Sequence, residues 1–356
     1  MRVALVGPPL SGKSTLFAAV AEAGGSNVDL SRPDQPHLAV VKVPDDRLGW
    51  LADLEKPRKV TPAELEFLDL PGFDLSDEAG RSRARVHWQT MEQSDLLAFV
   101  VAGFSDSTVP AYRGRVDPHA DVEELRSEML FADLERVTAR IEKLQAALKK
   151  PTAHREENLR ELELMNRLHD TLEAERPIAD AIEHEAEHKL VRSFQFLTLK
   201  PTLVVLNCGE ADASAEGPGE IGSLPCISLS AEIEEELAQL APPERAEFLA
   251  DLGIEAAARD RLIRACYGRL KLITFLTGGP SEAHAWSVPA GTDAVTAAGE
   301  IHTDIARGFI RAEVVAFDDL KAAGDHKAAK AAGKTRLEGK SYLVQDGDVI
   351  LFRFNV

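Results

Sequence analysis

The first residues of the chain follow an order of residue types that fits one local structure. Arg2–Val6 form a short apolar run typical of a β-strand, and the run leads directly into Gly7-x-x-x-x-Gly12-Lys13-Ser14. A helical pattern follows from Thr15 to Ala23. Small loop residues let backbone N–H groups converge on an anion, at the positive end of the following helix. The segment is therefore predicted to be a phosphate-binding loop between a strand and a helix.

The residue types in this loop indicate what it binds. In such loops the lysine reaches the β- and γ-phosphates of a nucleoside triphosphate, and the next hydroxyl ligates Mg²⁺. We expect Lys13 to be a catalytic residue and Ser14 to be a metal ligand. Nucleotide contacts are predicted from the loop and its continuation: Gly7, Leu10, Ser11, Gly12, Lys13, Ser14 and Thr15.

A second motif lies at the end of the apolar run Glu64–Asp69, which continues as Asp69-Leu-Pro-Gly72. In phosphate-loop hydrolases an Asp-x-x-Gly segment here holds the magnesium ion and senses the γ-phosphate. Alone, the segment is only a turn signal. Because it follows a strand behind a phosphate loop, we predict that Asp69 is a metal ligand and that Asp69 and Gly72 act with Lys13 in catalysis.

A third motif concerns the base. The run Thr202–Leu206 ends in Asn207-Cys-Gly-Glu210, where GTPases carry Asn-Lys-x-Asp, whose carboxylate binds guanine. Glutamate is longer by one methylene, so guanine selectivity is expected to weaken, but the chemistry alone does not select adenine. The segment after the last strand is predicted to close over the base, a role compatible with a simple helix cap by its serine. The expected base contacts are Asn207, Glu210, Ser230, Ala231 and Glu232.

Strand-like runs alternate with helical patterns, which indicates the α/β class with a parallel sheet covered on both faces. The predicted strands are Val3–Val6, Leu65–Leu68, Leu96–Val101, Thr202–Leu206 and Cys226–Leu229. We assign residues 1–120 and 196–274 to this nucleotide-binding domain.

The composition changes in the remaining segments. Residues 121–195 carry leucines at alternating steps of four and three, with a break at Lys149–Thr152, and predict an inserted, antiparallel coiled-coil hairpin. Residues 275–356 predict a small α+β domain. Its expected elements are strands at Glu282–Val288, Phe309–Ala316, Ser341–Val344 and Val349–Asn355, and a helix at His326–Ala332.

Charge and composition narrow the function classes. The formal net charge of −18 argues against a broad nonspecific nucleic-acid binder, and we expect no sequence-specific DNA binding. The three cysteines lack metal-ligand spacing, and no leader or membrane-length apolar run is visible. We therefore expect a cytoplasmic protein without a membrane partner.

Together these elements resemble the YchF family, the Obg-like ATPases, over the whole chain. The strongest likeness is C-terminal, at Ala298–Val314 and Gly339–Val356, which are similar to the family's TGS domain. The family's Asn-x-x-Glu is associated with ATP preference and matches Asn207 and Glu210. The resemblance implies an Obg-type G domain, a helical arm and a TGS domain. It also implies cytoplasmic ATP binding with slow hydrolysis and association with a ribosome or another ribonucleoprotein.

Three departures from the family pattern concern hydrolysis. Leu10 stands where the family's loop has Asn, Pro33 where the first switch has a magnesium-closing Thr, and Phe99 where a helper His is expected. We therefore expect weak hydrolysis. Two alternatives stay open: a GTPase switch, and a non-hydrolysing scaffold that acts through the arm and the TGS domain.

Overall fold

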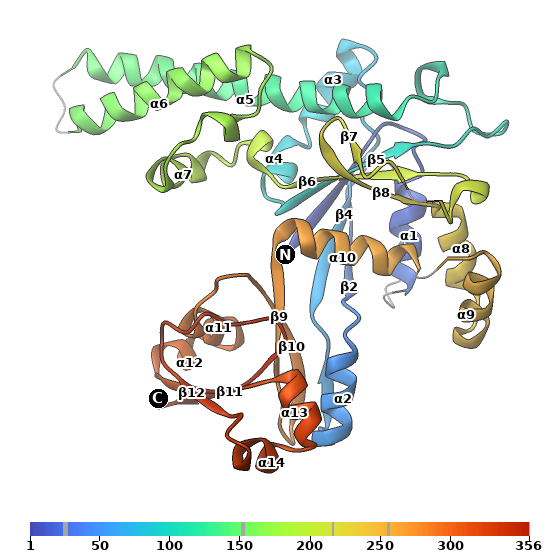
Figure 1. Cartoon of the computed structure of the whole chain (residues 1–356). Helices are drawn as coiled ribbons and strands as arrows, with labels where there is room; N and C mark the ends of the chain where they lie inside the picture. The colour runs from blue at the N-terminus through green and yellow to red at the C-terminus, as the bar shows by residue number, and fades with distance from the viewer. Residues whose placement is uncertain (24–27, 151–153, 216, 255–256, 356) are drawn as a thin grey trace. The chain divides into compact units, whose positions relative to one another are not determined.

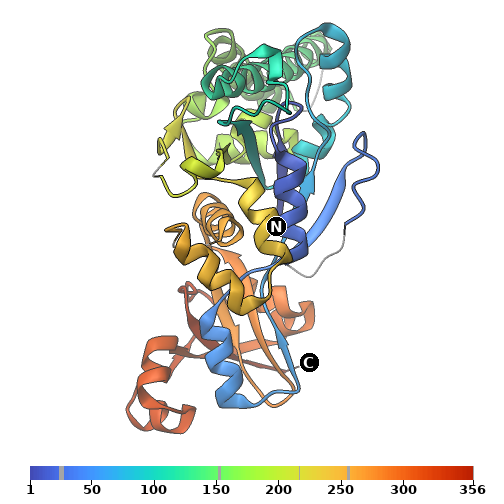
Figure 2. The same ribbon diagram turned by 90° about the vertical axis from the view of Figure 1, so that its right-hand side faces the viewer.

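The computed structural model describes residues 1–23, 28–150, 154–215, 217–254 and 257–355. Contacts divide the chain into two compact units. The first unit is Met1–Ala39 with Glu66–Arg259, and the second is Val40–Leu65 with Asp260–Val356. Figures 1 and 2 show the elements of each unit, which we describe separately.

The first unit is built on a seven-stranded sheet in the order β2-β4-β1-β5-β6-β8-β7. The pairs β4–β1, β1–β5, β5–β6 and β6–β8 are all parallel. The strands are β1 (Arg2–Val6), β2 (His37–Lys42), β4 (Glu64–Asp69), β5 (Leu96–Ala102), β6 (Thr202–Asn207), β7 (Glu220–Ile221) and β8 (Leu224–Leu229). The five predicted strands are confirmed as β1, β4, β5, β6 and β8. Their carboxyl ends meet at one edge, where such sheets place their ligands.

Helices pack around this sheet, and two of them, α1 and α8, begin close to that edge. α1 begins at Lys13, directly after the phosphate loop, and packs beside α8, which begins at Ala231. Among the helices of this unit are α1 (Lys13–Ala23), α3 (Glu78–Arg85), α4 (Trp88–Glu92), α8 (Ala231–Gln239) and α9 (Pro242–Asp251). The helix α10 (Ala258–Leu270) begins at the end of this unit and belongs mostly to the second. No helix in the described ranges has both the length and the apolar composition needed to cross a membrane.

The predicted helical hairpin is confirmed as α5 (Pro118–Leu148) and α6 (Arg155–Glu173), which lie side by side in Figure 1. The break follows α5 at Lys149; Pro151 and Thr152 of the predicted break lie outside the described residues. The apolar seam packs as one core: Leu130, Leu134, Val137, Ile141 and Leu144 against Leu162, Leu164, Met165, Leu168 and Leu172. The first turns of α5 instead pack on the sheet, through Val122, Leu125 and Met129. One continuous helix thus belongs first to the sheet and then to the arm.

Polar contacts fasten the base of this arm. The buried Asp133 of α5 accepts hydrogen bonds from the N–H groups of Leu197 (2.9 Å) and Thr198 (2.8 Å), in the segment that returns to β6. Burial raises the pKa of this carboxyl to about 6, against the opposing effect of these donors. Arg136 donates to the Phe194 carbonyl at 3.0 Å. The return segment itself contains α7 (Glu185–Val191) and the short 3₁₀ turns at Ile178–Ala181, Arg192–Phe194 and Leu197–Leu199.

The second unit contains a six-stranded sheet in the order β12-β11-β13-β9-β10-β3. Its strands are β3 (Lys59–Thr61), β9 (Leu272–Thr277), β10 (Glu282–Pro289), β11 (Phe309–Ala316), β12 (Arg336–Glu338) and β13 (Asp348–Phe354). Its helices are α2 (Asp46–Glu55), α11 (Ala294–Ile301), α12 (Thr303–Arg307), α13 (Phe317–Ala323) and α14 (His326–Ala331). Three predicted strands and the predicted helix are confirmed as β10, β11, β13 and α14, with ends that differ by at most one residue.

The predicted strand at Ser341–Val344 is wrong. The chain turns there, because the Tyr342 N–H donates to the Gly339 carbonyl, and only an isolated bridge joins Leu343 to Asp293. The carboxylate of Asp348 holds this turn by accepting from the Tyr342 hydroxyl (2.7 Å) and from the Gln345 N–H (2.9 Å).

Residues 40–65 are grouped with the C-terminal residues, although the sequence places them within the range assigned to the nucleotide-binding domain. β3 pairs in parallel with β10, and Lys59 forms an ion pair with Glu282 at 2.9 Å. Arg47 of α2 likewise pairs with Asp346 at 2.7 Å. These pairings join residues more than 200 positions apart, which a boundary drawn along the sequence does not capture.

Candidate functional site

The phosphate loop leaves β1 in a conformation that small residues permit. Gly12 has φ +80°, and a Cβ atom there would lie 2.0 Å from Nδ2 of Asn207. A Cβ atom on Gly7 would lie 2.2 Å from the Val100 carbonyl oxygen. Leu10, at φ +62°, keeps a left-handed backbone without being glycine, and its side chain is exposed. Both predicted loop glycines are therefore required by close approach.

The loop lysine, Lys13, lies at the centre of a buried polar cluster. The Lys13 ammonium, only 4% exposed, donates to Asp69 Oδ1 and to the Leu70 carbonyl. Ser14 Oγ donates to Asp69 Oδ2 at 2.7 Å. Burial lowers the pKa of Lys13, while the charge of Asp69 opposes this shift. The structure thus brings together the lysine, hydroxyl and carboxylate of two motifs more than 50 residues apart.

The same cluster fits a magnesium ion by the chemistry of its donors. Mg²⁺ prefers oxygen ligands and is commonly held by one or two protein oxygens together with water and substrate phosphates. Ser14 Oγ and Asp69 Oδ2 provide two such oxygens next to the phosphate loop. They are the residues that would hold the ion.

The Asp-x-x-Gly segment lies directly against the phosphate loop. A Cβ atom on Gly72 would lie 2.9 Å from Cα of Pro9, and the Phe73 N–H donates to the Gly7 carbonyl at 2.9 Å. A cavity of about 370 Å³ is lined by the loop residues Pro8–Thr15, by Pro33 and by Gly72. Pro33, at the first-switch position, and Gly72 of the Asp-x-x-Gly segment therefore face the same space as the loop.

Asn207 ties the base-binding motif to the phosphate loop. Its Nδ2 donates to the Ser11 carbonyl at 3.0 Å, and its Oδ1 accepts from the Ala231 N–H at 2.9 Å. The side chain is buried, and Ser230 caps α8 by accepting from the Ile233 N–H. Three predicted segments are thus connected through one amide.

The two predicted acidic base contacts are placed differently. Glu210 opens a short 3₁₀ turn after β6, and Glu232 lies in the first turn of α8; both side chains are exposed. They stand at the sheet edge beside Asn207 but outside the buried amide network.

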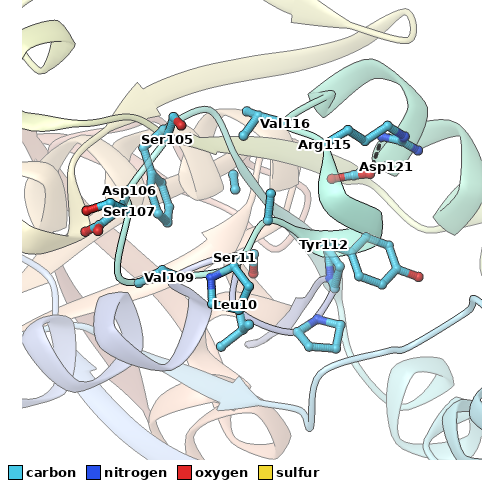
Figure 3. A pocket seen from close by; sticks show the side chains of 16 residues that line it. Leu10, Ser11, Ser105, Asp106, Ser107, Val109, Tyr112, Arg115, Val116 and Asp121 are labelled. Carbon is cyan, nitrogen blue, oxygen red and sulfur yellow. Dashed lines mark hydrogen bonds and ion pairs between the residues drawn. The ribbon is translucent and has the colours of Figure 1, made fainter.

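A further cavity of about 310 Å³ adjoins the phosphate loop and was not predicted. Figure 3 shows Leu10 and Ser11 between two stretches of the β5–α5 connection, with the Arg115–Asp121 ion pair (3.1 Å) at one end. Its apolar lining includes Phe104, which lies within 3.8 Å of where a Cβ on Gly209 would stand. A signal was present: Phe104 follows the carboxyl end of β5, the same sheet edge as the predicted residues.

The structure also places two of the departures from the family pattern, Pro33 and Phe99, and Phe73, which is not a departure. Pro33 lines the phosphate cavity, and Phe99 is fully buried in the core of the sheet. Phe73, directly after Gly72, is 4% exposed and stacks on His87 with ring centroids 6.1 Å apart. None of these three side chains carries a group that would hold or orient a water molecule.

Comparisons with known proteins agree with this architecture. Residues 2–143 match the family described as "50S ribosome-binding GTPase", and residues 272–355 match the C-terminal YchF-GTPase family described as "Protein of unknown function (DUF933)". The solved YchF GTPase of Schizosaccharomyces pombe superposes with a TM-score of 0.84 at 25% identity, covering 99% of this chain and 97% of that chain.

Relatives extend the likeness over the full length. The ribosome-binding ATPase YchF of Bacillus subtilis is 39% identical over 99% of this chain and 98% of its own. Obg-like ATPase 1 of Oryza sativa subsp. japonica is 35% identical over 100% of this chain and 92% of its own. The fold is that of a phosphate-loop NTPase with an inserted helical arm and a C-terminal TGS-like domain. The chain therefore belongs to the YchF family of Obg-like ATPases.

Proposed function

We propose that this protein is a magnesium-dependent ATPase of low turnover that associates with ribosomes. The observation that carries the nucleotide part is the buried cluster of Lys13, Ser14 and Asp69 at the phosphate loop. The ribosome part is supported by relatives of nearly equal length that are named ribosome-binding ATPases.

The geometry suggests how the loop would bind a triphosphate. Lys13 is held by Asp69 and by the Leu70 carbonyl, so binding requires its ammonium to exchange these oxygens for phosphate oxygens. Magnesium would supply charge neutralisation at the phosphates. Asp69 and Ser14 provide its protein oxygens, and the release of Lys13 frees one carboxylate oxygen of Asp69. Nucleotide and metal binding are therefore expected to support each other.

We propose that the base of the nucleotide binds beside Asn207 and against the ring of Phe104. Asn207 bonds to the Ala231 N–H and to the Ser11 carbonyl, and Glu210 of the same motif follows three residues later. The cavity in Figure 3 offers an aromatic ring and aliphatic surface next to the loop that would hold the phosphates. Flat apolar surface of this kind suits a purine ring.

Replacement of Phe104 by alanine should weaken ATP binding without affecting binding of inorganic tripolyphosphate. Stacking of a base on an aromatic ring contributes about 1–3 kcal/mol, so we expect a loss of roughly 5- to 150-fold for ATP. Calorimetric titration of both ligands measures this. Phe131→Ala, at an exposed position of α5, is the matched control. Equal ATP affinity in Phe104→Ala and the native chain would exclude this binding position for the base.

Three side chains support low turnover. Pro33 has no hydroxyl to close over the metal, and Phe99 is buried in β5. Leu10 replaces a polar loop residue and is exposed. A residue that orients water or stabilises the transition state contributes about 10³-fold or more in related enzymes. The site thus retains binding groups, and these three positions of the described chain offer no group that would position water.

The test compares binding and turnover under the same conditions. We expect magnesium–ATP to bind more tightly than magnesium–GTP, and ATP turnover to fall below that of the Bacillus subtilis relative. Tighter GTP binding would select the GTPase switch. Turnover equal to that of the relative would refute impaired hydrolysis. Binding of neither nucleotide would favour the scaffold alternative.

A further inference from the structure

The helix after the Asp-x-x-Gly segment carries an unusual concentration of positive charge. α3 (Glu78–Arg85) contains Arg81, Arg83 and Arg85, and no acidic residue occurs from position 79 to position 91. The chain as a whole has a formal net charge of −18. A basic segment against this background is a local feature that the proposed nucleotide site does not use.

The packing of α3 directs two of these arginines to solvent. Gly80 and Ala84 are buried and form the inner face, and a Cβ atom on Gly80 would lie 1.9 Å from the Asp74 carbonyl oxygen. Arg81 points inward enough to reach Glu128 of α5 at 3.3 Å. Arg83 and Arg85 lie on exposed positions of the same helix.

The two exposed arginines are weakly engaged. Within the part of the chain that the structure describes, the side chain of Arg83 makes no hydrogen bond or ion pair. Arg85 reaches Glu78 at 3.5 Å and lies over the ring of Trp88, 5.6 Å from its centroid. The next residue, Val86, is 74% exposed. Guanidinium groups that are free to form bidentate hydrogen bonds match phosphate oxygens in geometry and charge.

The position of α3 links this surface to the nucleotide site. The helix begins shortly after Gly72, which contacts the phosphate loop. The connecting residue Leu75 is held on both sides: its N–H donates to the Tyr112 hydroxyl at 2.9 Å, and its carbonyl accepts from Arg113 at 2.9 Å. Figure 1 shows α3 beside α5, in agreement with the Arg81–Glu128 pair.

We propose that Arg83 and Arg85 of α3 form a contact surface for the phosphate backbone of ribosomal RNA. This inference rests on the proposed ribosome association and names the surface that would make the contact. Charge complementarity favours RNA as the partner, because the surface offers two exposed, weakly engaged guanidinium groups in a protein with a formal net charge of −18. Each phosphate neutralised by such a group releases counterions, which makes binding salt-dependent.

The test measures ribosome affinity as a function of potassium chloride concentration, by anisotropy of the labelled full-length chain with magnesium–ATP present. For Arg83→Gln/Arg85→Gln we expect binding to weaken by about tenfold or more. We also expect the slope of log affinity against log salt concentration to be smaller in magnitude by about 1.4–1.8, which is about 0.7–0.9 for each phosphate contact. The matched control is Arg160→Gln/Arg307→Gln, whose arginine side chains are 76% and 74% exposed on other elements.

The outcomes separate this inference from the proposed function. If the native chain does not bind ribosomes at any salt concentration, the proposed association fails. If it binds and the α3 variant keeps its affinity and slope, or if the control loses as much, the α3 surface is excluded. A second measurement uses protein-free ribosomal RNA as a competitor. This RNA should bind the native chain more tightly than it binds the α3 variant. Equal binding of both to this RNA would assign the surface to a ribosomal protein and overturn the inference.

Discussion

Lys13→Ala is expected to abolish measurable ATP binding at micromolar nucleotide concentrations while the chain stays folded. The ammonium is 4% exposed and lies at the phosphate loop, where it would exchange the oxygens of Asp69 and Leu70 for phosphate oxygens. Removal of one partner from a buried, hydrogen-bonded charge pair costs about 2–5 kcal/mol, which corresponds to a loss of ~30-fold or more. Calorimetric titration with magnesium–ATP measures the change.

The substitution of Lys13 also affects the stability of the protein without nucleotide, which the control must measure. Without Lys13, the carboxylate of Asp69 stays buried with Ser14 as its remaining side-chain donor, so some loss of stability is expected. Circular dichroism and urea unfolding of the variant show whether the fold is kept. Lys143→Ala, at an exposed position of the arm, should leave both affinity and stability unchanged. Native-like ATP affinity in Lys13→Ala would mean that the loop does not hold the phosphates.

Local sequence patterns predicted the parts of this molecule that depend on neighbouring residues. The five predicted strands of the parallel sheet are short, largely apolar runs, and the arm follows from the spacing of leucines and other apolar residues on two helices. The strand Lys59–Thr61 gives no such signal, because it has only three residues and two of them are exposed. Its partner lies more than 200 residues further along the chain. Strands of this kind are defined by tertiary pairing.

The candidate site divides in a similar way. The meeting of Lys13, Ser14 and Asp69 follows from two motifs at the ends of adjacent parallel strands, so the sequence was sufficient. The cavity beside Phe104 depends on how the long β5–α5 connection folds back on the phosphate loop. That connection has no periodic pattern from which its path could be predicted. The engagement of Lys13 by the Leu70 carbonyl likewise requires coordinates.

The amide of Asn207 explains why the loop and the base segment would act together. It is the single side chain that bonds to both the Ser11 carbonyl and the Ala231 N–H. A Cβ atom on Gly12 would collide with its Nδ2, so the loop glycine and the amide fit each other closely. A shift of the loop on phosphate binding would therefore be transmitted to the first turn of α8 through this amide.

Asn207→Asp is expected to lower both stability and ATP affinity. The aspartate can still accept from the Ala231 N–H. Its second oxygen would take the place of Asn207 Nδ2, which donates to the Ser11 carbonyl at 3.0 Å, and an oxygen there cannot donate. An unsatisfied buried acceptor costs about 1–3 kcal/mol, and a buried charge adds to this. We expect destabilisation of roughly 2–4 kcal/mol and at least tenfold weaker ATP binding.

Urea unfolding and calorimetry measure the two effects, and Asn166→Asp on the exposed face of α6 is the matched control for the change of charge. Asn207→Ala removes both hydrogen bonds without adding a charge. If the alanine variant lost ATP affinity as strongly as the aspartate variant, the loss of the two hydrogen bonds of the Asn207 amide would be responsible. If the aspartate variant unfolded at the native urea concentration and bound ATP as the native chain does, Asn207 would not connect the two segments in solution, and the base segment would have to be positioned by the Ser230 cap alone.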